Sequence, residues 1–434
     1  MLLNLVFILN IFSAAHAEGE WSTVASLPWG RSDHTATTIG SAIYVAGGCD
    51  GAQKWNGNFM ACTSYSNNLM AFSPNTGTYS YKAAMPRPRY RHLSCPIGSD
   101  SMLIMGGRNV VDDSIITELD LYNATTNKWI TLTAVSFPTS LLGTDNSCSS
   151  LGGTSYIFGG YNSDYSVSYG SMASFKLSSN GLSGAFTSLA TMPRGIGDFS
   201  SVILGSKIYV YGGYSTVYTP ANPDWTCKPL TSLYIYDITS NSWQTGSDLP
   251  FPLAEKDDGV VIGGRIFSIG GETKRITSGC IDTDIVALKN VFAYNPVMGT
   301  WSNETWLPSS IMRFASAEYG GSIYVFGGQM DIIDSNTLPL SYKVWQYNPF
   351  PVPPSSSLIS IFYYTGFSSG TLALSVILSI VLTLGATCVL MRVSPKCLNC
   401  LKCGAPRCCC GSTSAGIPLH GVDRERADSI QAVA

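Results

Sequence analysis

Charged side chains recur in this sequence a few residues after a repeated dipeptide of one apolar residue and proline. Arg31 and Arg89 each lie three residues after such a proline. An arginine beside a carboxylate can anchor a polar ligand, and such a pair can also take part in acid–base catalysis. The charged residues of these segments are Arg31, Asp33, Arg89, Arg91, Arg194, Asp198, Glu255, Lys256, Asp257, Asp258 and Arg313.

A second set of reactive side chains is a group of cysteines between residues 397 and 410. The C-x-x-C spacing suits tetrahedral zinc, but no second such pair lies at domain distance and the nearest histidine is His420. Cysteines among basic residues beside a membrane segment are typical of S-palmitoylation. We therefore expect lipidation, with zinc binding and unmodified thiols as alternatives, at Cys397, Cys400, Cys403, Cys408, Cys409 and Cys410.

The elements that position the charged residues are repeated six times. Each repeat has a short apolar run that ends in two glycines, and the first glycines are at 47, 106, 159, 212, 270 and 327. Two aromatic columns follow, the first at Phe72, Tyr122, Phe175, Tyr236, Tyr294 and Tyr347, the second at Tyr79, Trp129, Phe186, Trp243 and Trp301. Each repeat predicts four short strands, a to d, with strand b buried on both faces.

A four-stranded sheet of this size buries its faces only by stacking against other sheets around an axis, as in a propeller. The sixth repeat ends at Pro349 with no tryptophan strand, and an unused tryptophan, Trp21, lies near the N-terminus. We expect the N-terminal strand to complete the last blade and to close the ring.

This pattern of apolar run, Gly-Gly, tyrosine and tryptophan resembles the kelch repeat over residues 18–350. The third copy departs from it, because Phe175 and Phe186 stand there without a tryptophan, so its blade could be irregular. The resemblance implies an all-β fold, a six-bladed kelch-type β-propeller closed by the N-terminal strand. One C-terminal transmembrane helix is expected in addition.

In such a propeller the d–a and b–c loops emerge on the same face, so the charged residues meet the aromatic residues of the long b–c loops. Loops on a rigid scaffold are where binding residues concentrate. The predicted ligand-binding face comprises Trp55, Phe59, Arg89, Tyr161, Tyr165, Arg194, Tyr214, Tyr218, Trp225 and Arg313. His34 and His92 share one repeat position, which favours a structural role, so we expect no metal and no cofactor.

Five segments are expected along the chain. Residues 1–17 have an apolar run and an A-x-A site, typical of a signal peptide, with an uncleaved anchor as the alternative. The propeller (18–350), a stalk (351–368), a transmembrane helix (369–391) and a Cys-rich tail (392–434) follow. Thr371–Met391 is long enough to cross a bilayer, and the basic residues after it predict a cytoplasmic tail.

Six cysteines lie in the expected propeller, an even number that fits an oxidising compartment. We expect Cys49–Cys62 and Cys227–Cys280 bridges from their places in b–c loops. Cys95 and Cys148 lie in a column of small residues near the axis, where either a buried thiol or a bridge between blades is possible. Glycosylation is expected at Asn123 and Asn303, which both begin N-x-T sequons near outer strands.

The 434 residues are only 12% charged, with a net charge of −3, which gives no reason to expect a nucleic-acid partner. We expect a single-pass type I protein of the plasma membrane or an endomembrane, whose propeller recognises a protein or glycan outside the cytoplasm. The alternative is a carbohydrate-acting enzyme such as a sialic-acid mutarotase, because some similar kelch propellers act on sialic acids. Arg89 or Arg194 would then work with Glu255. A scaffold that signals through its tail is a third, weaker alternative.

Overall fold

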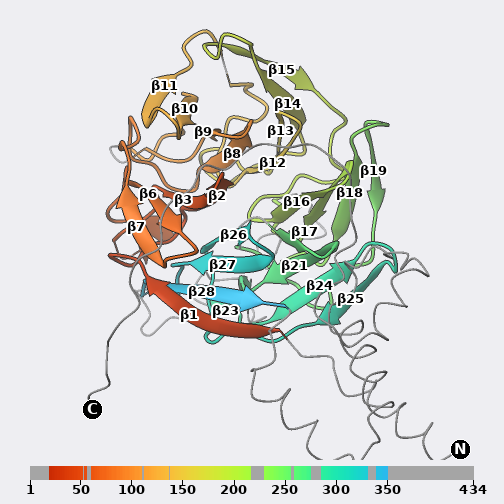
Figure 1. The fold of residues 1–434 in the computed structure, drawn as a ribbon. Coiled ribbons are helices and arrows are strands. Elements are labelled where there is room, and N and C mark those ends of the chain that lie inside the picture. The colour runs from red at the N-terminus through yellow and green to blue at the C-terminus, as the bar shows by residue number, and fades with distance from the viewer. Residues whose placement is uncertain are drawn as a thin grey trace, which may run out of the picture. The chain divides into compact units, whose positions relative to one another are not determined.

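The computed structural model describes residues 19–349, apart from 52, 56–59, 110–111, 136, 217–228, 256–258, 275–284 and 331–338. This region forms six four-stranded antiparallel sheets arranged around a central axis, which confirms the predicted propeller (Figure 1). No helix occurs among these residues. The long apolar segment at 369–391 lies outside them, and no helix of the described part is long and apolar enough to cross a membrane.

The blades follow the chain in order, each with strand a innermost. Blade 1 has β2 (Thr35–Ile39), β3 (Ala42–Ala46), β6 (Leu69–Ser73) and β7 (Thr78–Tyr81); blade 2 has β8 (Leu93–Ile97), β9 (Ser101–Met105), β10 (Asp120–Asn123) and β11 (Lys128–Thr131). Blade 3 has β12 (Ser147–Leu151), β13 (Thr154–Phe158), β14 (Met172–Leu177) and β15 (Gly184–Ser188); blade 4 has β16 (Ser200–Leu204), β17 (Lys207–Tyr211), β18 (Leu233–Asp237) and β19 (Ser242–Thr245).

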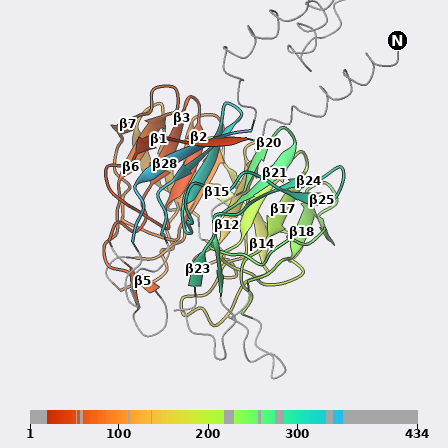
Figure 2. The same ribbon diagram turned by 90° about the horizontal axis from the view of Figure 1, so that it is seen from below.

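Blade 5 has β20 (Val260–Ile262), β21 (Arg265–Ile269), β24 (Val291–Asn295) and β25 (Thr300–Asn303). Blade 6 has β26 (Ala315–Tyr319), β27 (Ser322–Phe326), β28 (Lys343–Asn348) and β1 (Glu20–Ser26). Two b–c loops carry extra hairpins, β4 (Gln53–Trp55) with β5 (Met60–Cys62), and β22 (Glu272–Lys274) with β23 (Ile285–Ala287). Figure 2 shows β5 and β23 projecting from the same side of the propeller.

The b strands are almost wholly buried, as their unbroken apolar runs predict, and β9 and β27 are buried at every residue. The d strands are mostly exposed. The glycine pair that ends each b strand is needed sterically: Gly48 has a φ of 92°, and a Cβ there would lie 2.6 Å from the Ser32 carbonyl oxygen. Glycine therefore lets the chain after strand b pass close to the segment that leads into strand a.

The two aromatic columns pack against each other within every blade, with ring centroids 4.8 to 5.1 Å apart. Phe175 and Phe186 make this contact in blade 3 at 4.8 Å, so the blade without a tryptophan is a regular four-stranded sheet. In four blades the indole N–H of strand d also donates to a main-chain carbonyl in the d–a connection that precedes the blade. The acceptor lies three residues before the proline of that connection, as in the bond from Trp129 to Ala83 at 2.7 Å. The d strand is thereby tied to the neighbouring blade.

The N-terminal strand completes the last blade, as the sequence predicts. β1 pairs with β28, placing Trp21 opposite Tyr347. The Trp21 indole donates to the carbonyl of Thr305 at 2.9 Å, in the connection from blade 5. The first and last strands of the propeller therefore share one sheet, which closes the ring.

Two disulfides lie in the described region. Cys49 is bonded to Cys62, which confirms that expected pair. Cys95 and Cys148, left open by the sequence, are bonded as well, with their Cα atoms 5.8 Å apart, and they join strand a of blade 2 to strand a of blade 3. Cys227 and Cys280 lie outside the described residues, as do the expected signal peptide, stalk and tail cysteines.

Candidate functional site

Six charged residues form a ring at the mouth of the central channel, one from each blade; we call it the channel ring. Its members are Asp33, Arg91, Asp145, Asp198, Glu255 and Arg313, and all have a positive φ between 49° and 56°. This left-handed conformation is uncommon for residues other than glycine, and it clusters at functional sites. Its regular use by six charged residues makes the ring the first candidate site.

Backbone hydrogen bonds link the ring from blade to blade. The amide of Arg91 donates to the carbonyl of Asp33 at 3.0 Å, and Asp33 donates in the same way to Arg313 at 2.9 Å. Asp145, Glu255 and Arg313 repeat this bond to the preceding member at 2.8 to 3.3 Å. The six side chains are consequently held by the rigid centre of the fold.

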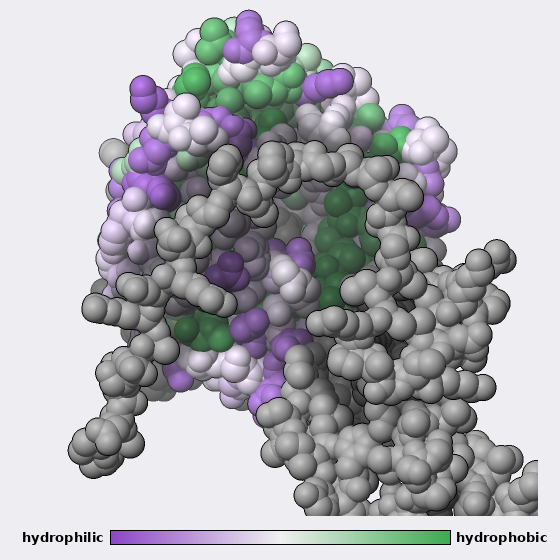
Figure 3. All heavy atoms as spheres, in the orientation of Figure 1, coloured by the Kyte–Doolittle hydropathy of each residue, from purple (hydrophilic) through white to green (hydrophobic). Residues whose placement is uncertain are grey.

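The side chains of the ring are unevenly charged, with four carboxylates and two guanidinium groups. Arg91 Nε lies 3.4 Å from Asp33 and its Nη1 lies 3.4 Å from Asp145, whereas Arg313 Nη2 donates to Glu255 at 2.7 Å. They enclose a cavity of about 90 Å3 together with residues such as His34 and His92. Figure 3 looks onto the opposite face of the propeller, the side of the a–b and c–d turns, where hydrophilic and hydrophobic side chains are mixed.

The pKa values of the carboxyl groups in this cavity are driven apart. Burial, with the nearby Glu255 and Asp145, raises the pKa of Asp198 well above its usual range. Burial also opposes ionisation of Glu255, but Arg313 and Arg91 outweigh it and lower the pKa of that carboxyl. The ring therefore favours the protonated form of the Asp198 carboxyl group and the ionised form of the Glu255 carboxyl group.

A second layer of side chains comes from the position directly after each glycine pair. Its members are Cys49, Arg108, Tyr161, Tyr214, Glu272 and Gln329, and all are buried. Each forms a β-bridge with the residue just before a ring member, as Arg108 does with Tyr90. Sequence reasoning missed Arg108, Glu272 and Gln329, although their shared place after Gly-Gly was a signal that could have found them.

One second-layer arginine is connected to the ring through an aromatic residue. The hydroxyl of Tyr165 accepts from Arg91 Nη1 at 2.7 Å and from Arg108 Nε at 3.3 Å. The Arg108 guanidinium also lies over the Tyr165 ring, 4.6 Å from its centroid. Tyr165 therefore joins the b–c loops of blades 2 and 3 to the mouth of the channel.

Comparison with known proteins now defines the family. Residues 78–338 match the family described as the Attractin/LZTR1 beta-propeller, and residues 30–86 match the Kelch motif. The chain belongs to the Attractin/LZTR1 beta-propeller family. Kelch propellers of this kind typically act as protein-interaction modules.

Individual relatives of this kelch propeller are distant. Kelch-like protein terF of Aspergillus terreus is 24% identical over 353 residues, which cover 78% of this chain and 69% of terF. Kelch domain-containing protein 3 of Homo sapiens is 24% identical over 332 residues, covering 71% and 83% of the two chains. The solved structure of YjhT has a TM-score of 0.56 at 13% identity, over 73% of this chain and 96% of YjhT, and so shows the fold alone.

The kelch propeller places the predicted face residues in different environments. Arg89 is 0% exposed, donates to the Gly106 carbonyl at 3.0 Å and pairs with Asp120 at 2.5 Å, so its assignment to the ligand-binding face was wrong. Arg31 makes the equivalent bond to Gly47 in blade 1. Both arginines support the b strands from inside.

Of the remaining predicted residues, Arg313 belongs to the channel ring, while Tyr165 and Arg194 are half-buried. Tyr161 and Tyr214 are only 3% and 7% exposed and belong to the second layer. The side chain of Trp55 and the residues Phe59, Tyr218 and Trp225 lie outside the described part of the chain.

The two propeller histidines are buried at equivalent positions. Burial and the neighbouring Arg89 lower the pKa of His92 to about 3, so its imidazole is neutral. Within the described ranges, no group of three or more histidine, cysteine, aspartate or glutamate side chains is arranged to hold a metal ion. Packing against the inner strands is the role that the structure supports for both histidines.

Glu272 of the second layer should make the stability of this kelch propeller depend on pH. Burial, with Glu255 nearby, raises its pKa from 4.5 to about 7, while Arg313, Lys274 and a hydrogen bond from Tyr214 at 2.7 Å oppose the shift. Because the pKa of Glu272 is higher in the folded than in the unfolded chain, its protonated form stabilises the fold at pH values below the unfolded pKa. This contribution is lost as pH rises through the folded pKa. The unfolding free energy of wild type should fall between about pH 5 and about pH 6.5. In Glu272→Gln we expect this fall to be smaller by about 2 kcal/mol.

Urea unfolding of wild type and variant across this range measures the effect. Glu318→Gln, at an exposed position of β26, is the control and should leave the pH profile of the wild type unchanged. Identical pH profiles for Glu272→Gln and wild type would contradict the prediction that Glu272 makes the stability depend on pH.

Proposed function

We propose that this protein is a single-pass membrane protein that displays its kelch propeller outside the cytoplasm and recognises a protein ligand there. The observation that carries the proposal is the channel ring, six charged side chains held in an uncommon backbone conformation at one mouth of the channel. A mixed set of fixed charges gives orientation and specificity to an interface. Its rigidity lowers the entropic cost of binding.

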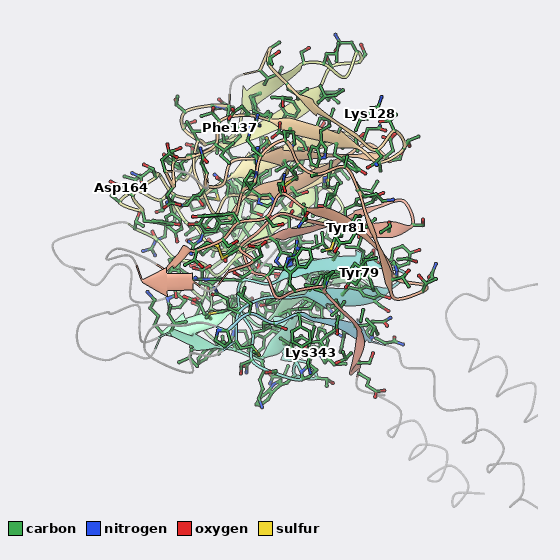
Figure 4. The ribbon with its side chains drawn as sticks, turned by 90° about the vertical axis from the view of Figure 1, so that its left-hand side faces the viewer. Tyr79, Tyr81, Lys128, Phe137, Asp164 and Lys343 are labelled. Carbon is green, nitrogen blue, oxygen red and sulfur yellow. A yellow bond between two sulfur atoms is a disulfide. The ribbon has the colours of Figure 1, made fainter. Side chains whose placement is uncertain are left out.

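The loops around the ring supply the area that such an interface needs. The hairpins β4–β5 and β22–β23 project from the side of the b–c loops (Figure 2). Figure 4 places Asp164, in a b–c loop, on the opposite side from Lys128, at the start of an outer strand. The proposed ligand therefore meets the b–c side of the propeller, which we call the loop face.

Several features support a location outside the cytoplasm. Two disulfides in one domain suit an oxidising compartment. Asn303 is exposed on the outer strand β25, where a glycan has room, and Asn123 lies at the end of β10 in the outer half of blade 2. The signal-like segment 1–17 and the apolar segment 369–391 complete a type I arrangement, with lipidation of the tail cysteines as an additional attachment to the membrane.

The alternative function as a carbohydrate-acting enzyme takes second place. Neighbouring carboxyl groups with separated pKa values, such as Asp198 and Glu255, are a pattern of acid–base catalysis. The cavity beside them, however, is about 90 Å3, well below the roughly 300 Å3 at which small-molecule sites begin. Glu255 also pairs with Arg313, and neither Arg89 nor Arg194 is its partner in the described contacts. This geometry favours recognition over turnover.

A binding screen tests the proposal. Cells displaying the full-length chain are probed with panels of secreted and cell-surface proteins and with a glycan array. We expect a protein ligand whose affinity falls about tenfold, or 1.4 kcal/mol, in Lys274→Glu, because Lys274 stands on β22 of the loop face. Lys128→Glu, on the outer strand β11, is the matched control and should bind normally.

Either of two outcomes would contradict the proposal. One is a displayed, folded propeller that binds no member of either panel. The other is a ligand that is lost in Lys128→Glu but retained in Lys274→Glu. Turnover of a sugar substrate by the folded chain would instead favour the enzyme.

A further inference from the structure

A groove of about 630 Å3 lies on the loop face between the b–c loops of blades 2 and 3. Arg108, Asp112 and Asp113 come from the blade 2 loop, and Asn162, Asp164 and Tyr169 come from the blade 3 loop. Its volume falls within the range of about 300 to 1,000 Å3 that is usual for binding sites. The groove is therefore large enough for several side chains of a partner, which the channel cavity is not.

The charges of the groove do not balance. Among the lining residues that the structure describes, the one cation is Arg108, which is 1% exposed. It is used within the wall, where Nη1 lies 3.2 Å from Asp113 and Nη2 donates to the Ser163 carbonyl at 2.7 Å. Asp112 and Asp164 are both exposed, one in each of the two loops. Three carboxylates thus face one arginine whose charge is already paired.

The two exposed carboxylates are held by matching local bonds. Asp112 Oδ1 accepts from the amide and hydroxyl of Ser114 at 3.1 and 2.7 Å, and Asp164 Oδ1 accepts from those of Ser166 at 3.0 and 2.6 Å. The serine hydroxyl and amide lower the pKa of each carboxyl, so both stay ionised at neutral pH. Both negative charges are consequently permanent and fixed in position.

We propose that this groove binds a basic segment of the protein ligand, with lysine or arginine side chains between Asp112 and Asp164. The inference rests on the proposed function as a recognition module. Tyr169, half-buried in the wall, adds an aromatic surface on which a cation can sit.

The groove is also preorganised. Arg108 reaches from the blade 2 loop to Ser163 and Tyr165 of the blade 3 loop, and Tyr165 is bonded in turn to Arg91 of the ring. The two walls are therefore tied to each other and to the centre of the propeller. Binding of a partner therefore costs little entropy for ordering the two walls, and a bound cation meets two charges whose positions are already fixed.

Peptide binding to the full-length chain in detergent tests the inference by fluorescence anisotropy. The probe is a labelled peptide of alternating lysine and glycine, and the matched peptide replaces each lysine by glutamine. We expect the lysine peptide alone to bind, and to weaken as salt is added. Asp112→Asn/Asp164→Asn should raise its Kd at least about tenfold, because two of the attracting charges are lost.

Asparagine keeps the oxygen that accepts the serine bonds, so the double variant should fold. Asp237→Asn is the matched control, because Asp237 Oδ1 accepts similar local bonds from Thr239 and Ser240 in a c–d turn away from the loop face. It should leave the Kd within about twofold of wild type.

Three results would overturn the inference. They are equal binding of the lysine and glutamine peptides, an unchanged Kd in the double variant, and binding of a neutral oligosaccharide in the groove in place of the lysine peptide. A protein ligand found in the screen that is lost in Lys274→Glu but retained in Asp112→Asn/Asp164→Asn would sustain the proposed function while rejecting this groove as its site.

Discussion

Replacing Cys95 and Cys148 together by alanine is expected to lower the free energy of unfolding by about 4 kcal/mol. The bond joins the first strands of blades 2 and 3 and closes a loop with a sequence separation of 53 residues. In the chain-entropy account, a longer closed loop restricts the unfolded chain more. The Cys49–Cys62 bond has a separation of 13 residues and should be worth less, about 3 kcal/mol.

Guanidinium unfolding of the full-length chain, with both pairs of alanine variants compared, measures the two contributions. The cysteines of both pairs are 0 to 7% exposed, so the loss of packing is similar in the two variants and their difference reports the two bonds. A larger loss for Cys49→Ala/Cys62→Ala than for Cys95→Ala/Cys148→Ala would contradict the prediction. It would mean that the loop of blade 1 contributes more to stability than the contact between blades.

Arg89→Met is expected to cost about 3 kcal/mol of unfolding free energy, the lower end of the range for breaking a buried ion pair. Asp120 is 1% exposed and would lose one of its two arginines, and the Gly106 carbonyl would lose its donor. Arg87 Nη1 remains 2.5 Å from Asp120, which keeps the loss from being larger. The effect falls on the fold, because Arg89 makes its contacts inside blade 2.

The control for this variant is Arg194→Met. Arg194 is half-buried, and its replacement should change the unfolding free energy by about 0.5 kcal/mol or less. Equilibrium unfolding measures both variants. If folded Arg89→Met kept its stability but lost the ligand of the screen, Arg89 would belong to the binding face after all.

Arg89 and Arg91 show where sequence reasoning stops. The two residues are only two positions apart, and in a continuous strand they would point to the same side. Arg91, however, has a φ of 53°, which turns the chain so that its side chain enters the channel while that of Arg89 enters blade 2. The sequence does not indicate this turn, because its usual sign is a glycine and an arginine stands at this position.

The repeat, the buried b strands and the aromatic columns could be predicted from the sequence because each depends on contacts within one blade. Closure by β1 could also be predicted, since the missing tryptophan of the sixth repeat and the unused Trp21 are two halves of one pattern. The tertiary structure alone decided the Cys95–Cys148 bond, the membership of the channel ring and the groove between blades 2 and 3. Each depends on distances between neighbouring blades. The packing of one blade against the next fixes those distances, and the sequence pattern of a single repeat does not indicate it.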